Sequence, residues 1–96
     1  MSGYIVLPRA RADLREIWSY TAGEWGMAQA DRYIRDIEML FQAVAEHSKR
    51  GRACDEIRAG YSRISVGSHV VFYRATRAKI SIVRVLHQRM DFPRRL

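Results

Sequence analysis

The chain has 96 residues and a formal net charge of +7, with 17 Lys or Arg against 10 Asp or Glu. This length predicts one domain, residues 1–96, and the hydrophobic content of 48% excludes a disordered chain. The sequence shows no apolar run long enough to span a membrane, no signal peptide, and a single cysteine, Cys54, which excludes an internal disulfide. We therefore expect a cytoplasmic protein that does not contact a membrane.

The first predicted element is a short strand at residues 4–7, which ends at Pro8. Apolar residues then recur at helical spacing, and Gly26 is placed to end this first helix. A second helical pattern follows almost at once, so we expect an antiparallel helical hairpin over residues 11–46. The stripes predicted to face the rest of the fold are Leu14, Ile17, Trp18, Thr21 and Trp25 in one helix and Ala30, Tyr33, Ile34, Ile37, Phe41 and Val44 in the other.

After residue 60 the apolar pattern has a period of two and predicts strands at residues 61–66, 69–74 and 80–86. Gly67-Ser68 fits the centre of a type II′ hairpin turn. The last two strands are apolar on both faces, which is typical of central strands or of a sheet that something outside the fold covers. The order β-α-α-β-β-β predicts an α+β fold, with an N-terminal strand and an antiparallel α-hairpin packed on a small antiparallel β-sheet.

The positive charge is concentrated in the strand-rich half. Residues 58–96 contain nine Lys or Arg and one acid, whereas residues 1–57 contain eight Lys or Arg and nine acids. The two halves therefore have net charges of +8 and −1. Such an asymmetry indicates an acidic partner, either a nucleic acid or an acidic protein segment. Because the chain has no base-stacking pattern and no helix-turn-helix signature, we expect no sequence-specific binding of nucleic acid.

Several short motifs occur in an order that is specific to one family. They are Ala12-Asp13-Leu14, Glu16-Ile17-Trp18, Trp25-Gly26, Glu56-Ile57-Arg58, Gly60-Tyr61 and the runs over residues 67–74 and 82–91. In this respect the chain resembles the ParE toxins of bacterial type II toxin–antitoxin modules, within the RelE/ParE superfamily, over roughly residues 4–96. It departs from the usual family pattern at Ser62, where a second Arg is usual, and at Ser48, where Pro is usual.

The resemblance implies a toxin that inhibits DNA gyrase and blocks replication. It also implies neutralisation by a ParD-like antitoxin with an acidic, amphipathic C-terminal segment, in a heterotetramer or larger assembly built on antitoxin dimers. Neither role needs catalysis, a metal or a cofactor. The alternative is a RelE-like ribosome-dependent mRNA endonuclease, in which Arg63, Arg84 and His87 would be catalytic. A third reading is a degenerate toxin fold that only binds its antitoxin.

The candidate sites fall into two groups. Basic and aromatic side chains are expected to bind the antitoxin: Trp18, Arg58, Tyr61, Arg63, Phe72, Arg74 and Arg84. Polar side chains after the last strand are expected to bind the target: His87, Gln88, Arg89, Met90, Asp91, Arg94 and Arg95.

Each candidate also has a purely structural interpretation. The arginines can form a solvated face, Trp18 and Trp25 can belong to the core, and His87 can close the last strand with a backbone hydrogen bond. We expect residues 92–96 to be dispensable for folding, the alternative being that Phe92 and Leu96 pin this tail onto the helical hairpin.

Overall fold

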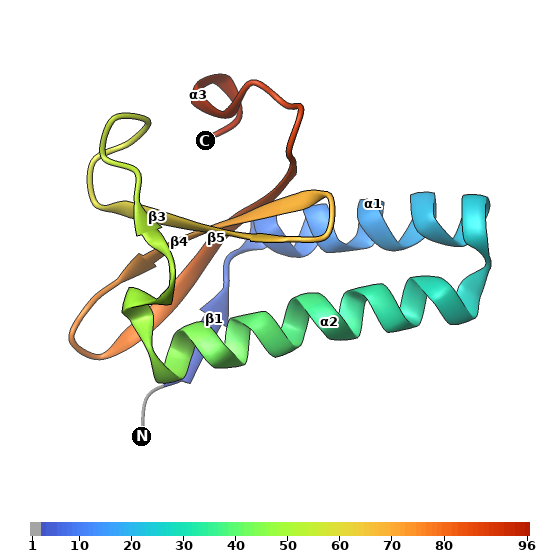
Figure 1. Ribbon diagram of the computed structural model, residues 1–96, viewed down its shortest axis with the longest axis horizontal. Helices are drawn as coiled ribbons and strands as arrows, with labels where there is room; N and C mark the ends of the chain where they lie inside the picture. Colours follow the sequence, from blue (N-terminus) through green and yellow to red (C-terminus); the bar gives the residue numbers. More distant parts are fainter. Residues whose placement is uncertain (1–2) are drawn as a thin grey trace.

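The computed structural model describes residues 3–96, apart from the side chain of Lys49. The elements are β1 (Gly3–Val6), α1 (Pro8–Trp25), α2 (Met27–Glu46), the 3-10 helix η1 (Ser48–Arg50), β2 (Arg52–Ala53), β3 (Tyr61–Val66), β4 (His69–Ala75), β5 (Lys79–His87) and α3 (Phe92–Arg95). The predicted α+β order is confirmed, while η1, β2 and α3 are short elements that the sequence pattern did not indicate. The two long helices lie side by side, and α3 lies apart from them beyond the strands (Figure 1).

A single glycine joins the two long helices. Gly26 has a φ of 95° and ends α1, where its backbone N–H donates to the carbonyl of Ala22 at 2.9 Å. The carbonyl of the same glycine accepts a hydrogen bond from the N–H of Ala30 in the first turn of α2. A positive φ favours glycine at this position, and the chain reverses within one residue. The predicted helical hairpin and its glycine stop are therefore confirmed.

The strands form one sheet in the order β1-β5-β4-β3-β2. Strands β3 to β5 pair antiparallel, as predicted, and β2 also pairs antiparallel with β3, but β1 pairs parallel with β5, with Tyr4 beside Ile80. The sheet is therefore mixed rather than purely antiparallel. Only strands joined by tight turns must run antiparallel, whereas the long connection between β1 and β5 permits a parallel pair. At the β3–β4 turn Gly67 has a φ of 55° and Ser68 has a negative φ, which agrees with the predicted type II′ turn.

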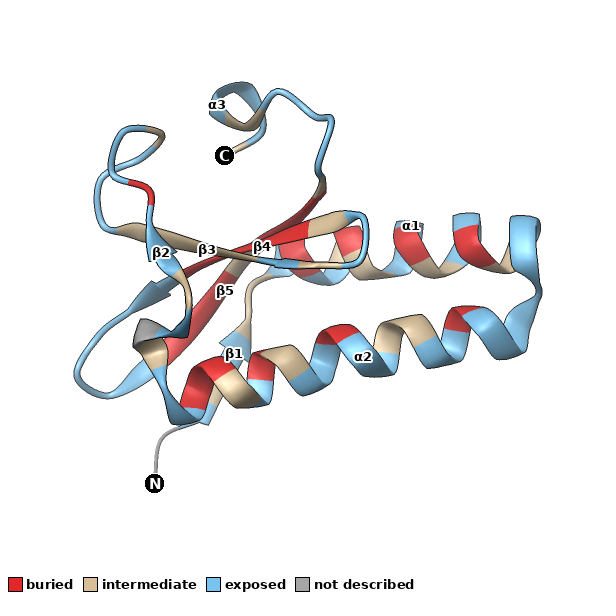
Figure 2. Ribbon diagram, viewed as in Figure 1, coloured by how far each residue is buried: buried red, intermediate tan, exposed pale blue. Residues whose placement is uncertain are grey.

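One face of the sheet packs against the helical hairpin, and we call it the helix-side face. Its core contains Ile17, Ile37 and Phe41 from the helices, so those members of the predicted stripes are confirmed. Buried positions recur along α1 and α2 and through β4 and β5 (Figure 2). Trp25, however, is 73% exposed, so its predicted place in the core is wrong. The hairpin extends beyond the sheet at this end, and the last turn of α1 has no strand to pack against (Figure 1).

The opposite face, which we call the tail-side face, carries a second, smaller cluster. Its buried members are Cys54, Val70, Phe72 and Leu86, and its partly buried members are Ile57, Tyr61, Phe92 and Leu96. The rings of Phe72 and Phe92 make an edge contact with centroids 4.9 Å apart. Strands β4 and β5 are central in the sheet, which confirms the first of the two predicted alternatives, and the chain's own tail covers part of their second face. Phe92 and Leu96 do pack against the fold, but their apolar partner is the sheet and not the helical hairpin of the predicted alternative.

Candidate functional site

Strand pairing places basic side chains in a row across the tail-side face. Arg52 of β2 is the register partner of Arg63 in β3, which in turn pairs with Phe72 in β4. In the next row Tyr61 is opposite Arg74. Side chains alternate between faces along a strand, so residues 61, 63, 72 and 74 share this face and the even-numbered residues of β3 point toward the helices. Residues from three strands and from the loop before β3 thus form one basic surface.

Tyr61 lies at the centre of this surface. The guanidinium carbons of Arg58 and Arg74 are 5.9 and 5.8 Å from its ring centroid, within the range of a cation–π contact. Arg58 also donates to the backbone oxygen of Leu96 at 2.9 Å. Within residues 3–96 none of Arg52, Arg58, Arg63 and Arg74 forms an ion pair with a side-chain carboxylate. We call Arg52, Arg58, Tyr61, Arg63 and Arg74 the basic face.

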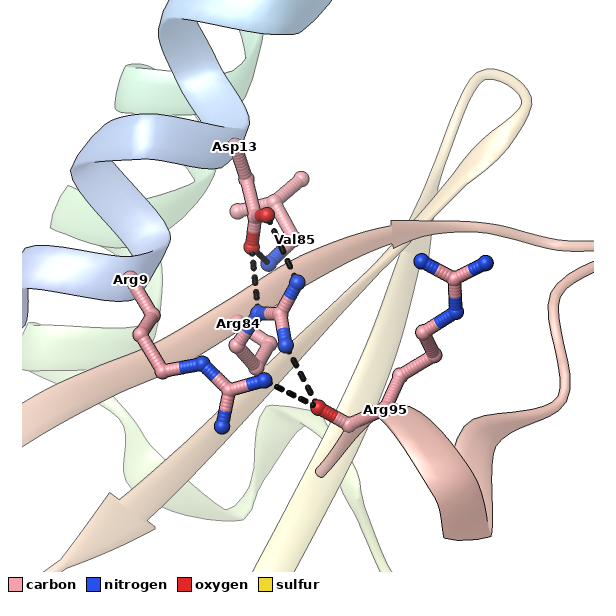
Figure 3. A network of polar contacts seen from close by, with 5 residues as sticks. All are labelled: Arg9, Asp13, Arg84, Val85 and Arg95. Atoms are coloured by element: carbon pink, nitrogen blue, oxygen red, sulfur yellow. Dashed lines mark hydrogen bonds and ion pairs between the residues drawn. The ribbon is translucent and has the colours of Figure 1, made fainter.

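Arg84 was expected among these exposed arginines, but it is buried. Two of its nitrogens, Nε and Nη2, each donate to a carboxylate oxygen of Asp13 at 2.8 Å, and both side chains are only 10% exposed. The N–H of Val85 donates to the same carboxylate at 2.9 Å, and Arg84 Nη1 donates to the carbonyl of Arg95 (Figure 3). The hydrogen bond with Asp13 is the main cause that raises the pKa of Arg84. The guanidinium of Arg84, a residue of β5, is therefore hydrogen-bonded both to α1 and to the tail.

Two other candidate antitoxin contacts are not on the basic face. Phe72 is fully buried beneath Phe92. Trp18 lies on the helical hairpin, where its indole N–H donates to Asp31 of α2 at 2.8 Å. Its partly buried ring therefore joins the two helices, whereas it was expected to contact the antitoxin or to pack on the sheet. The structure thus brings together Arg58, Tyr61, Arg63 and Arg74, and adds Arg52, which the sequence analysis did not select.

The candidate target contacts follow β5 and cross from one side of the molecule to the other. The N–H of Gln88 donates to the carbonyl of Ser68 at 2.9 Å, so the segment begins beside the β3–β4 turn. Met90 is 38% exposed. Asp91 and Arg94 form an exposed ion pair at 3.4 Å. Both Arg84 and Arg9 donate to the carbonyl of Arg95 (Figure 3), while the side chain of Arg89 is exposed.

His87 points away from the basic face. Its ring makes an edge contact with His69 at 5.3 Å, and His69 Nδ1 lies 2.7 Å from the hydroxyl of Tyr33 in α2. The N–H of Arg89 donates to His87 Nδ1 at 3.1 Å, which is the backbone hydrogen bond of the structural interpretation. Burial, and then the neighbouring His87, lower the pKa of His69. The three residues that a nuclease would need are therefore separated, because Arg63 lies on the basic face and Arg84 is buried.

Asp13 is the residue of this region that sequence reasoning missed. It lies on the buried stripe of α1 with Ala10, Ile17 and Thr21. An acid at a core position needs a buried cation or several hydrogen-bond donors, so the place of Asp13 on the apolar stripe could have predicted a buried ion pair.

Among residues 3–96, no group of three or more His, Cys, Asp or Glu side chains is placed to hold a metal ion. Within the described part of the chain, no helix is both long and apolar enough to cross a membrane.

Comparison with known proteins identifies the family. A family model described as ParE toxin of type II toxin-antitoxin system, parDE, matches residues 4–92. Toxin ParE1 of Mycobacterium tuberculosis is 49% identical over 96 residues, which cover 99% of this chain and 98% of the relative. Toxin ParE1 of Caulobacter vibrioides is 44% identical over 91 residues, which cover 95% and 94% of the two chains. Toxin ParE of Escherichia coli is 36% identical and covers 100% of this chain and 94% of its own.

A solved structure has the same fold. It is titled "Chromosomal ParDE TA system from P. aeruginosa", and its TM-score is 0.78 at 19% sequence identity. The match covers 91% of this chain and 95% of the other. The family match extends over the helical hairpin and all the strands that carry the basic face, so the resemblance noted from the sequence is confirmed. This chain belongs to the ParE toxin family of type II toxin–antitoxin systems.

Proposed function

We propose that this toxin inhibits DNA gyrase and blocks replication in the cytoplasm, and that a ParD-like antitoxin neutralises it. The antitoxin's acidic, amphipathic C-terminal segment folds onto the basic face, and antitoxin dimers build a heterotetramer or larger assembly. The observation that carries the antitoxin site is the group of arginines around Tyr61, none of which pairs with a side-chain carboxylate within residues 3–96. Carboxylates of a partner are suited to these guanidinium groups, and apolar anchors are suited to the aromatic ring between them.

We further propose that the toxin acts by binding and not by catalysis. An endonuclease needs an acid, a base and charge-stabilising groups that converge within hydrogen-bond reach of one phosphate. Arg84 is held in a buried ion pair with Asp13. His87 contacts His69 on the far side of the sheet from Arg63. This separation favours gyrase inhibition over mRNA cleavage. The target contacts are proposed for residues 87–91 with Arg94 and Arg95.

The antitoxin surface can be tested by charge reversal. Arg63→Glu and Arg74→Glu should each lower the association rate of a ParD-like antitoxin by roughly tenfold at low salt, because they remove steering charge. Arg35→Glu, an exposed position on α2, is the matched control and should change the rate much less. The association rate of the wild type should fall as salt rises. A rate that does not change between low and physiological salt contradicts a role for the basic face.

The target can be tested by adding purified toxin separately to gyrase supercoiling and to in vitro translation. We expect supercoiling to be inhibited and mRNA to stay intact. Cleavage of mRNA without an effect on supercoiling would replace the proposed target with the ribosome.

A further inference from the structure

A groove of about 630 Å³ lies on the side of the molecule opposite the basic face. It is bounded by α1, α2, the turn between β3 and β4, and the residues that end and follow β5. Ile17 and Val85, both buried, contribute its apolar base. The candidate antitoxin contacts Arg58, Tyr61, Arg63 and Arg74 are absent from its lining.

Large apolar side chains are exposed along this groove. Tyr20 is 70% exposed, Trp25 is 73% exposed and Met90 is 38% exposed. They come from the middle and the end of α1 and from the segment after β5, so a single frayed helix end does not explain them. Aromatic residues and methionine are enriched at protein interfaces, and tryptophan and tyrosine are enriched among the residues that dominate binding energy. Three such side chains around one concave surface are typical of a docking site.

The groove is also held in shape before anything binds. The Tyr33 hydroxyl accepts a hydrogen bond from the N–H of Ser68 at 3.1 Å and contacts His69 Nδ1 at 2.7 Å. A Cβ at Gly67 would lie only 2.6 Å from the Tyr33 oxygen, so the turn and α2 are in close contact. Because these contacts already fix the turn against α2, the groove itself loses less conformational entropy when a partner binds.

The charge of the groove is opposite to that of the rest of the molecule. The chain contains 17 Lys or Arg, yet no described side chain that lines the groove is Lys or Arg. Asp13 is compensated by Arg84, and Glu16 supplies a further carboxylate. Two carboxylates against one guanidinium leave a net negative charge. An acidic antitoxin segment therefore suits the basic face and does not suit the groove.

We propose that this groove is a second binding surface, which takes a segment of the toxin's cellular target. The segment inserts an apolar side chain among Tyr20, Trp25 and Met90 and places a Lys or Arg beside Glu16. The inference rests on the toxin function and adds to the proposed tail contacts, since His87 and Met90 belong both to the tail and to the groove. Toxicity then uses this groove together with the tail, whereas neutralisation uses the basic face.

The test uses the intact chain with Trp25→Ala, Glu16→Lys or the milder Glu16→Gln, each expressed from a titratable promoter. The matched controls are Met39→Ala, which is 65% exposed outside the groove, and Glu38→Lys on the exposed side of α2. We expect Trp25→Ala and Glu16→Lys to raise the amount of toxin needed to halve the growth rate by roughly tenfold or more. Glu16→Gln should have a smaller effect, and the controls should have little.

Antitoxin affinity, measured by titration calorimetry on the same proteins, separates this role from damage to the fold or to the basic face. We expect it to change less than about threefold in every groove variant, since charge and contacts at the basic face are unchanged. Unchanged growth inhibition in Trp25→Ala and Glu16→Lys overturns the inference, as does a parallel loss of antitoxin affinity. If the wild type arrests growth without inhibiting supercoiling, the gyrase proposal fails while the groove result stands.

Discussion

The two faces of the sheet are built from the same strands but are covered in different ways. Two helices of 18 and 20 residues cover the helix-side face, whose cluster contains eleven buried residues. The cluster on the tail-side face contains four buried residues, and α3, which packs on it, has four residues and none buried. The arginines that surround Tyr61 lie only on the second face. This contrast suggests that most of the folding free energy comes from the helix-side face. The tail-side face has less apolar cover, which leaves its arginines accessible for the binding role proposed above.

The largest expected effect tests where the stability comes from. Phe41 is fully buried between α2 and the sheet, with its ring in edge contact with Tyr4. Phe41→Ala should lower the free energy of unfolding by about 3–5 kcal/mol, because it leaves a cavity in the larger core. Urea denaturation gives the value. As a control, Met39→Ala on the exposed side of the same helix should change the free energy of unfolding by no more than about 0.5 kcal/mol. A loss below about 1 kcal/mol for Phe41→Ala would contradict the inference that the helix-side face supplies most of the stability.

The next effect tests the link between the two faces. Asp13→Ala leaves the Arg84 guanidinium without its carboxylate. Breaking a fully buried pair costs about 3–5 kcal/mol, and we expect about 2–4 kcal/mol here because part of each side chain is exposed. The double variant Asp13→Ala with Arg84→Met should recover much of this loss, since it removes the unpaired charge. A double variant no more stable than Asp13→Ala would mean that hydrogen bonds to the backbone, and not the charge pair, dominate.

A smaller effect tests how much the packing of the tail on the tail-side face contributes to stability. Phe92→Ala should lower the free energy of unfolding by about 1–2 kcal/mol, less than a fully buried phenylalanine, because Phe92 is only partly buried. Deletion of residues 92–96 should lower the unfolding midpoint further, since it also removes the carbonyls that Arg9, Arg58 and Arg84 bind. An unchanged midpoint after deletion would show that residues 92–96 do not stabilise the tail-side cluster.

The smallest expected effect concerns pH. Burial, reinforced by His87 and opposed by Asp13, lowers the pKa of His69 below the usual value of 6.5. As pH falls through 6.5 the unfolded chain binds a proton before the folded chain does, so stability decreases toward acid. His69→Gln should therefore show a shallower loss of stability between about pH 7 and 5.5 than the wild type. Denaturation curves at several pH values measure both slopes, and equal slopes would contradict a neutral, partly buried imidazole.

The parts of the fold that follow from local rules could be predicted from the sequence. Helical spacing placed Ile37 and Phe41 in the core, and positive-φ turns required glycine at residues 26 and 67. These features depend on neighbours within a few positions, so the local pattern contains the information.

The parts that depend on distant segments could not be predicted in the same way. Asp13 and Arg84 are 71 positions apart, and a register shift between Phe72 and Tyr73 alters which residues of β5 lie opposite β4. Arg84 therefore looked like an exposed member of a basic edge. Trp25 looked like a core residue because helical spacing cannot show where a sheet ends. Only the tertiary arrangement decides such cases.

The one-residue helix connection also limits how this chain can change in length. A residue inserted beside Gly26 that is taken into α2 would rotate the rest of that helix by about 100° relative to the chain reversal, because an α-helix has 3.6 residues per turn. Such a rotation would turn Phe41 away from the sheet and bring charged positions inward. The loop over residues 54–60 and the turn over residues 76–78 have no such constraint, since no long helix follows either of them. Viable insertions and deletions should therefore gather in those two loops and avoid the helix junction.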